Sequence, residues 1–315
     1  MKVLHVTDRN FPLSADEGGA PQSLLRLVRA QKKAGCEVGI LTTGKSSVRS
    51  IGQFPQRSDP RKEIVNIARN YRADIIHFHA AAEWLQPPIV DAGVATVVHV
   101  RGLKVGGLSS YVNPIFVSKS HAKNHGRQQF VYNGIDPDSV RFEPHADGYL
   151  SFLGKVRRSK KGASTAVAVA KRTGRKLKLA GGRKFKIPQT WLPFQRNLET
   201  LGVLGHDEKM AMLGKSSALL FPIRWEEPFG LVLIEAMAVG TPVIAFSRGA
   251  VSEIVDDELT GFVVQTYEEM CDAVNRIGEI DREACRRHVV QNFSIDSTAS
   301  GMMRYYERAL DGEIW

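Results

Sequence analysis

The sequence predicts an α/β protein built from two doubly wound parallel-sheet domains. Short apolar segments alternate with longer amphipathic ones through the first half of the chain, and the alternation resumes after residue 147. This pattern is typical of buried parallel strands that are connected by crossover helices. The chain has 315 residues, which leaves room for two domains of about 150 residues each.

The first half supplies the elements of one such domain. Parallel sheets bind ligands beyond the carboxyl ends of their strands, so the loops that follow the strands are candidate sites. The apolar segments predict strands over residues 3–7, 37–42, 74–78, 95–100 and 115–117, and the amphipathic segments predict helices over 20–34, 61–71 and 119–125.

The second half supplies a second set. Strands are expected over residues 149–153, 177–182, 199–205, 218–222, 241–246 and 261–264, and an amphipathic pattern predicts a last helix within 293–310. A turn signal at Asn133 and Gly134 comes shortly before the change of domain. We therefore predict domains over residues 1–146 and 147–296, followed by a C-terminal helix over 297–315.

The composition favours a cytoplasmic protein. Cys36, Cys271 and Cys285 are odd in number and lack the spacing of metal ligands, so we interpret them as reduced thiols. The chain contains no apolar run of the roughly 18 residues that a transmembrane helix needs. The first residues, MKVLHVTD, enter a predicted strand directly and show no secretory signal pattern.

The formal net charge of +10 is concentrated in one segment. Residues 155–196 contain fourteen Lys and Arg and no Asp or Glu. A solvated face explains such a segment. A peripheral contact with anionic lipids on the inner face of the membrane explains it equally well. Nucleic acid is not expected as a partner.

Residues 218–240, with the sequence ALLFPIRWEEPFGLVLIEAMAVG, carry the clearest site signal. A short apolar strand leads through a loop into a helix that is expected to begin at Gly230 and end at Gly240. The backbone N–H groups of residues 229–231 would have no helical partners there, and together with the helix dipole they favour a phosphate. Gly230 would let an anion approach the backbone closely.

Two carboxylates flank this turn. Glu235 lies within an apolar helix, so it needs a partner; taken alone, it is best explained as one half of a structural ion pair. Glu227 ends the loop beside the expected phosphate seat. The two together favour a binding site over a structural pair.

The segment EEPFGLVLIEAMAVGTPVIAF resembles the donor-site signature of glycosyltransferase family 4, a retaining family with the GT-B fold. The resemblance implies two Rossmann-like domains that face each other across a cleft, with the C-terminal helix crossing back to the first domain. It also implies that Glu227 contacts the transferred sugar and Glu235 the ribose hydroxyls. The N–H groups of Phe229, Gly230 and Leu231 would hold the sugar or the diphosphate.

The same resemblance assigns further donor-binding residues. Gly18 and Gly19 correspond to a glycine pair that faces the donor, although Asp16 and Glu17 beside them would repel a phosphate. A lone histidine at a strand end is more often structural. The family nevertheless has an active-site histidine at the position of His99, and we assign His99 that role.

Two lysines are expected to bind the donor diphosphate. The family has a Gly-Arg pair where this chain has Gly154 and Lys155, and an ammonium group cannot form the two-pronged contact of an Arg. A Lys-Gly pair follows in the family. Lys160 and Lys161 compete for that position, and Lys161 fits better because it precedes Gly162.

His77 and His79 alternate onto one face of a strand and would suit a metal ion. Because no further ligand occurs at a recognisable spacing, we interpret both as structural and predict no metal site and no cofactor.

These observations predict a metal-independent, retaining glycosyltransferase of the hexosyltransferase type. The donor would be a nucleotide-diphosphate sugar and the acceptor a hydroxyl group, lipid-linked or on a glycan, in the synthesis of a cell-surface glycan, a glycolipid or a secondary glycoside. The alternatives are a nucleotide-sugar epimerase on the same fold and a non-catalytic protein that binds nucleotide sugars or anions.

Overall fold

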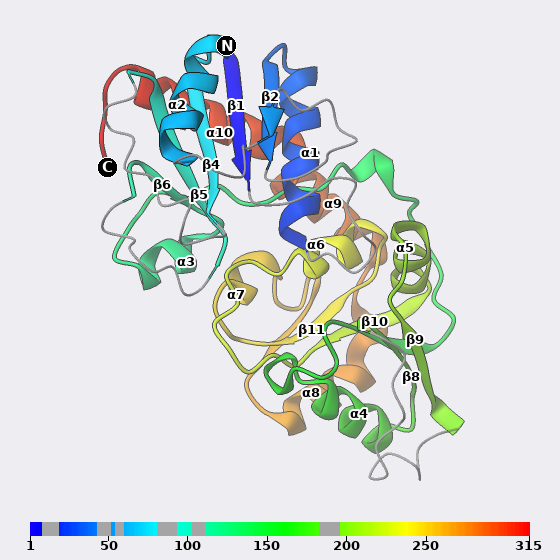
Figure 1. Ribbon diagram of the computed structural model, residues 1–315. Helices are drawn as coiled ribbons and strands as arrows, with labels where there is room; N and C mark the ends of the chain where they lie inside the picture. The colour runs from blue at the N-terminus through cyan, green and yellow to red at the C-terminus, as the bar shows by residue number, and fades with distance from the viewer. Residues whose placement is uncertain (8–18, 43–51, 54–59, 81–92, 103–110, 183–195) are drawn as a thin grey trace. The chain divides into compact units, whose positions relative to one another are not determined.

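The fold is given by a computed structural model, shown in Figure 1. It describes residues 1–7, 19–42, 52–53, 60–80, 93–102, 111–182 and 196–315. The chain divides into two compact units. Unit 1 comprises Met1–Gly134 and Ile295–Trp315, and unit 2 comprises Ile135–Ser294. The C-terminal segment therefore belongs to the same unit as the N-terminus.

Unit 1 contains a six-stranded sheet in the order β3-β2-β1-β4-β5-β6, and every strand pair in it is parallel. Strands β1 and β4 lie side by side where the order of the strands reverses, which is where sheets of this kind bind ligands. The strands are β1 (Lys2–Thr7), β2 (Glu37–Thr42), β3 (Gly52–Gln53), β4 (Ile75–Ala80), β5 (Ala95–Val100) and β6 (Pro114–Phe116).

Helices cover both faces of this sheet (Figure 1). Side chains at odd-numbered positions of β1, β4, β5 and β6, such as Val3 and Ile75, pack in one core cluster with Leu27 of α1 and Met302 of α10. Even-numbered positions of these four strands point to the other face, where α2 packs, because side chains alternate along a strand. The register with β1 reverses this numbering in β2, so Leu41 packs on the α2 face. The helices are α1 (Gly19–Lys33), α2 (Pro60–Tyr71), α3 (Lys119–Asn124) and α10 (Ile295–Leu310).

Unit 2 repeats the topology of unit 1. Its six-stranded sheet has the order β12-β11-β10-β7-β8-β9 and is also parallel throughout. Counted in chain order within each unit, both sheets read 3-2-1-4-5-6. The prediction of two doubly wound parallel sheets is confirmed. The strands are β7 (Tyr149–Leu153), β8 (Lys176–Ala180), β9 (Leu198–Gly202), β10 (Ser216–Phe221), β11 (Val243–Phe246) and β12 (Gly261–Val264).

The helices of unit 2 include the expected apolar one, α6, in which Leu233 to Ala238 are all buried. The elements of unit 2 also include the short 3₁₀ segments Pro137–Ser139, Ser159–Lys161 and Ile277–Glu279. The α-helices are α4 (Ala163–Arg172), α5 (His206–Gly214), α6 (Leu231–Ala238), α7 (Val251–Ile254), α8 (Tyr267–Arg276) and α9 (Arg282–Asn292).

The units divide after Gly134, earlier than the boundary near residue 146 that the sequence suggested. The reason is that the segment after Gly134 is fastened to the end of unit 2. The N–H of Ile135 donates to Phe293 O at 3.0 Å. Arg286 of α9 donates to the carbonyl oxygens of Pro137, at 2.6 Å, and Val140, at 3.3 Å. The chain returns to unit 1 at Ile295, close to the predicted start of the C-terminal helix segment.

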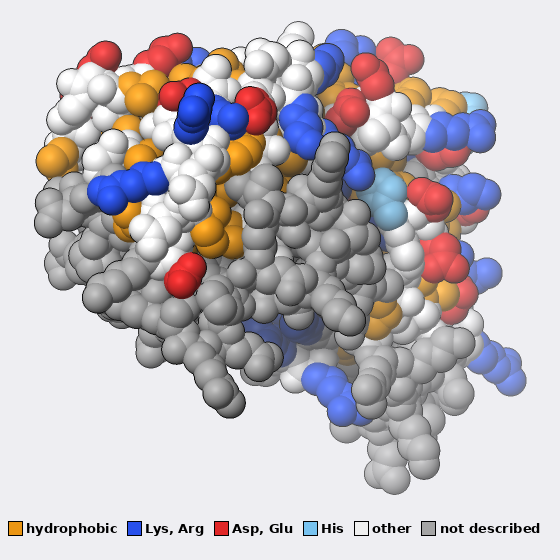
Figure 2. Space-filling model, turned by 45° about the horizontal axis from the view of Figure 1, so that its top comes forward, with side chains coloured by type: hydrophobic (Ala, Val, Ile, Leu, Met, Phe, Trp, Pro, Cys, Tyr) orange, Lys and Arg blue, Asp and Glu red, His pale blue; other side chains and the backbone are white. Residues whose placement is uncertain are grey.

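The basic segment after β7 is described in part. Its exposed side chains include Lys155, Arg157, Arg158, Lys160, Lys171, Arg172, Arg175 and Lys176. On the face shown in Figure 2, basic and acidic side chains are interspersed among polar and apolar ones. Within the described parts of the chain, no helix is both long and apolar enough to cross a membrane.

Candidate functional site

The loop between β10 and α6 leads into a helix that begins at the predicted glycine, and its use as an anion seat stays a prediction. Gly230 is the N-cap of α6 and has φ +89°, in the left-handed region. A Cβ atom there would lie 2.9 Å from Leu233 Cδ1, so both conformation and space require glycine. The first N–H groups of α6 have no partner within the helix. Phe229 buries its ring, which faces Phe293 edge-on at 6.1 Å.

Glu227 is held in place by two donors on one oxygen. Its Oε2 accepts a hydrogen bond from Lys161 Nζ at 3.0 Å and another from Trp225 Nε1 at 2.9 Å. The side chain is 11% exposed. Within the described part of the chain, Oε1 accepts no hydrogen bond. One oxygen of this carboxylate is therefore fixed, and the other is available to a ligand.

The ring of Trp225 also contacts two cations. Lys160 Nζ lies 4.0 Å and Lys161 Nζ 4.6 Å from the ring centroid, within the range of a cation–π interaction. Trp225 thus ties both lysines to the loop that carries Glu227. Of the two lysines that competed in the sequence, Lys161 is the one that contacts Glu227.

Close backbone packing holds the loop that contains Lys161 against the loop that contains Glu227. Gly162 has φ +78°, and a Cβ there would lie 1.9 Å from Pro222 O. Arg224 N donates to Lys160 O at 2.9 Å. These loops follow β7 and β10, the two strands at which the order of the sheet reverses. The site therefore lies where this topology binds ligands.

Glu235 forms the ion pair that its burial required. Its Oε1 lies 2.8 Å from Lys209 Nζ of α5, and the two side chains are 7% and 18% exposed. The pair fastens α5 to α6. The structural explanation of Glu235 is therefore correct as far as this contact goes, and a role toward the ribose stays a prediction.

Lys155 follows β7 directly and is exposed. Its side chain makes no hydrogen bond or ion pair with the described residues, so its ammonium group is available to a ligand. Gly19 is the first residue of α1, whereas Gly18 lies outside the described residues. The predicted diphosphate contacts of Lys155 and of the glycine pair stay predictions.

His99 lies near the carboxyl end of β5 in unit 1 and is fully buried. Its Nδ1 lies 3.1 Å from a terminal nitrogen of Arg101. A guanidinium group only donates, so Nδ1 accepts and the ring proton is on Nε2. Burial and the charge of Arg101 hold the pKa of His99 well below its usual value, which keeps the ring neutral. His99 is thus a neutral donor through Nε2.

Sequence reasoning missed several partners of these residues. Trp225 stands two positions before Glu227, and its indole N–H, a hydrogen-bond donor close to a carboxylate, was the signal that could have predicted their contact. The sequence predicted that Glu235 needs a partner, but it did not identify Lys209 as that partner. Arg101, two residues after His99, was given no role, although burial lowers its pKa to about 9.

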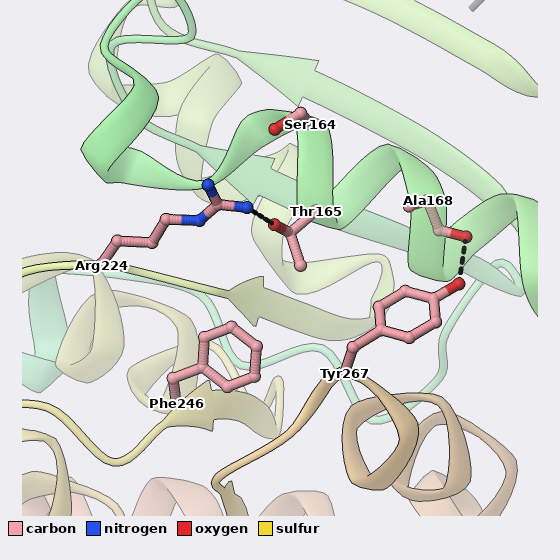
Figure 3. A pocket seen from close by; sticks show the side chains of 6 residues that line it. All are labelled: Ser164, Thr165, Ala168, Arg224, Phe246 and Tyr267. Carbon is pink, nitrogen blue, oxygen red and sulfur yellow. Dashed lines mark hydrogen bonds between the residues drawn. The ribbon is translucent and has the colours of Figure 1, made fainter.

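A separate hollow of 370 Å³ lies between α4 and α8 (Figure 3). Arg224 donates to Thr165 Oγ1 at 3.0 Å, and the Tyr267 hydroxyl donates to Ala168 O at 3.1 Å. Its lining is Ser164, Thr165, Ala168, Arg224, Phe246 and Tyr267, which includes none of the predicted site residues.

Comparison with known proteins supports a glycosyltransferase. The family model described as Glycosyl transferases group 1 matches residues 141–292, within unit 2. The D-inositol 3-phosphate glycosyltransferase of Rhodococcus erythropolis is 35% identical over 111 residues, 32% of this chain and 25% of that protein. The enzyme of the same name from Mycobacterium tuberculosis is 26% identical over 219 residues, 60% of this chain and 45% of that protein. The chain thus spans less than half of the length of these curated relatives.

Solved structures match along nearly the whole chain. AviGT4, a glycosyltransferase involved in avilamycin A biosynthesis, has a TM-score of 0.82 at 23% identity, covering 100% of this chain and 99% of that chain. The chain has the GT-B fold. Anabaena Alr3699/HepE in complex with UDP gives a TM-score of 0.78 at 15% identity, covering 98% of this chain and 100% of that chain. These neighbours confirm the predicted GT-B fold, and identities this low establish the fold alone.

Proposed function

We propose that the protein is a retaining glycosyltransferase of family 4 that transfers a sugar from a nucleotide-diphosphate donor to a hydroxyl group. The observation that carries this proposal is the start of α6. There the N–H groups after Gly230 lie beside Glu227, whose Oε2 is fixed by Lys161 and Trp225. The family-model match over unit 2 supports the same activity class.

In this proposal the donor diphosphate binds to the N–H groups of residues 229–231, to Lys155 and to Lys161. Lys161 can donate to the diphosphate and to Glu227 at the same time, because an ammonium group has three N–H donors and Glu227 accepts from one of them. Positive groups that are already in place stabilise the charge that develops on the leaving diphosphate, without the cost of reorganising solvent.

Glu227 would act on the sugar. Its Oε1 accepts hydrogen bonds from sugar hydroxyls, while Oε2 stays with Lys161 and Trp225. The negative charge also favours the positive charge that develops at the anomeric carbon. Glu235 would accept from the ribose hydroxyls, and Lys209 keeps its carboxylate in place.

Retention follows if the acceptor attacks from the face that the diphosphate leaves. A donor phosphate oxygen then takes the proton of the acceptor hydroxyl, and the new glycosidic bond forms as the bond from the anomeric carbon to the phosphate breaks. The proposal includes His99 as a neutral hydrogen-bond donor toward the sugar and the acceptor, which is the role that the resemblance implies.

The test begins with the donor. HepE has been solved with UDP and with UDP-glucose, so uridine-diphosphate sugars are the first donors to screen, followed by the other nucleotide sugars. A bound donor raises the melting temperature by mass action. Slow donor hydrolysis, followed by proton NMR, then reports the configuration of the first released sugar.

We expect one donor to stabilise the protein and to release sugar with its anomeric configuration retained. Glu227→Gln should bind that donor and release sugar much more slowly. No stabilisation by any nucleotide sugar would exclude the transferase proposal, and inversion would exclude the retaining part of it.

A further inference from the structure

Four histidines of unit 1 meet beneath α1 and α10. His5 of β1 is in register with His77 of β4, and His79 is in register with His99 of β5. All four stand at odd-numbered positions, so their side chains share the face that α1 and α10 cover. Each of them is at most 5% exposed. The register of three strands thus builds a buried cluster of imidazoles.

This cluster corrects one premise of the sequence analysis, which found no further ligand for His77 and His79. The third residue is His5, far away in the sequence and adjacent in the sheet. One ring nitrogen from each of His5, His77 and His79 can be chosen so that all three lie within 4.8 Å of one another. The His77 and His79 rings stack with centroids 4.2 Å apart.

Hydrogen bonds at the edge of the cluster fix the state of His5. Its Nε2 lies 2.8 Å from Gln31 Oε1, an oxygen that only accepts, so Nε2 carries the proton. The lone pair of His5 is therefore on Nδ1, which faces the cluster. It lies 2.8 Å from His79 Nε2, which must donate to it in the metal-free protein.

The other two rings leave polar atoms without partners. His77 Nδ1 lies 2.6 Å from the Tyr306 hydroxyl, whereas His77 Nε2 is buried and has no hydrogen-bond partner among the residues that the structure describes. His79 Nδ1 is likewise buried without a partner among them. Buried polar atoms in native proteins are nearly always paired, so an unpaired one points to an absent water or ion.

We propose that His5, His77 and His79 form a buried binding site for a divalent transition-metal ion of the zinc class. The ligands would be His5 Nδ1, His77 Nε2 and His79 Nε2. His79 frees Nε2 by moving its proton to Nδ1, so no proton leaves the protein. A set of imidazoles without a carboxylate favours zinc, copper, nickel or cobalt over magnesium and calcium.

The surroundings fit such a site. Metal-bound histidines commonly hydrogen-bond through the other ring nitrogen, and Gln31 and Tyr306 do this for His5 and His77. The Tyr306 oxygen can accept from His77 Nδ1 and from Gln31 Nε2, which lies 2.8 Å away. Bonds of about 2.0–2.1 Å to zinc place ligand nitrogens roughly 3.3 Å apart, so the three rings must draw together on binding.

The role of this ion would be structural. The ligands join β1 to β4, and their partners Gln31 and Tyr306 belong to α1 and α10. An ion there would fasten the C-terminal helix to the sheet of unit 1. The site contains no residue assigned to donor binding, so it stands independently of the proposed function.

The experiment measures metal bound by the full chain. The protein is unfolded by a denaturant in the presence of a chelator. It is then refolded with excess Zn²⁺ or Co²⁺, so that burial of the site does not block entry of the ion, and metal that is not tightly bound is removed. We expect about one ion per chain, a visible Co²⁺ spectrum of tetrahedral type and a melting temperature that Zn²⁺ raises. His79→Gln and His5→Asn should weaken binding at least tenfold, whereas His145→Gln, which removes an exposed histidine, should not.

Two results would overturn the proposal. One is a wild-type chain that refolds with Zn²⁺ and retains none above a metal-free control. The other is bound metal that His5→Asn and His79→Gln leave unchanged. If either variant fails to fold, the wild-type Co²⁺ spectrum and X-ray absorption still decide, since they show whether about three nitrogen ligands surround the ion.

Discussion

The two units share one topology and bury their polar groups in opposite ways. Unit 1 places uncharged imidazoles from adjacent strands beneath α1 and α10. Unit 2 places carboxylates beside lysines, Glu227 with Lys161 and Glu235 with Lys209. A neutral ring avoids the cost of burying a charge, whereas a buried carboxylate needs its cation. The same topology therefore supports a cluster of neutral polar side chains in one unit and ion-paired carboxylates in the other.

Acid should produce the largest difference in stability between the two units. Burial lowers the pKa of both His5 and His121 in unit 1 from 6.5 to about 4, and it lowers the pKa of His77, His79 and His99 as well. The unfolded chain binds these protons first, so stability is complete above pH 6.5 and falls as the pH drops toward 4. At pH 4.5 we expect a loss of roughly 2.5 kcal/mol for each of His5 and His121.

The measurement is hydrogen exchange with chelator-treated protein between pH 7 and 4.5, corrected for the intrinsic rate and resolved by peptide. Peptides of unit 1 should lose protection well before those of unit 2. His145→Gln, which removes an exposed histidine, serves as a control. A loss that begins in unit 2, or equal protection at both pH values, would contradict this comparison.

The two carboxylates of unit 2 should differ from each other in kinetics. Glu227→Gln removes a charge that is proposed to act on the transition state, so transfer should slow roughly ten- to thousandfold while the affinity for the free nucleoside diphosphate is kept. Glu235→Gln should weaken the binding of the nucleoside diphosphate as well as that of the donor, because the proposed ribose contact exists before and during the reaction.

Calorimetry with the nucleoside diphosphate of the identified donor, run beside turnover assays on both variants, distinguishes the two roles. The melting temperature of Glu235→Gln must be recorded too, because the substitution leaves the partly buried Lys209 without its charged partner. If Glu227→Gln no longer binds the nucleoside diphosphate and Glu235→Gln loses only turnover, the two roles are exchanged.

Trp225 should have a smaller effect that acts through Glu227. Trp225→Phe keeps an aromatic ring for Lys160 and Lys161 and removes the N–H that donates to Glu227 Oε2. A hydrogen bond to a charged group contributes about 1.5–3 kcal/mol, so transfer should slow about tenfold or more with little change in the affinity for the nucleoside diphosphate. Lys160→Gln removes a cation from the ring without touching Glu227 and should change turnover less. Equal turnover of wild type and Trp225→Phe would show that the indole does not position Glu227.

The units also differ in how much of their structure could be predicted from the sequence. Periodicity and strand length predicted both sheets, because buried parallel strands are apolar over their whole length. The site in unit 2 could be predicted because Glu227, Gly230 and Glu235 lie within one short stretch. Lys209 could not be identified as the partner of Glu235, since the packing of α5 on α6 decides it.

The cluster in unit 1 depends on strand order. His5 meets His77 only because β4 pairs with β1, and nothing local in either strand states that pairing. His77 and His79 therefore appeared as two isolated ligands. The units' division after Gly134 was missed for a related reason, because Arg286 of α9 binds the segment that follows.

The smallest predicted effect tests whether the units respond separately. Thr266 caps α8 in unit 2, and its hydroxyl accepts from Glu269 N at 3.1 Å. Thr266→Ala should cost about 1 kcal/mol, and Thr266→Ser, which keeps the hydroxyl, should cost less. Hydrogen exchange at pH 7 should then show about fivefold faster opening in unit 2 and no change in unit 1, since 1.4 kcal/mol corresponds to a factor of ten. If protection falls equally in both units, the chain unfolds as one cooperative body, and the acid sensitivity of the buried imidazoles would be felt throughout it.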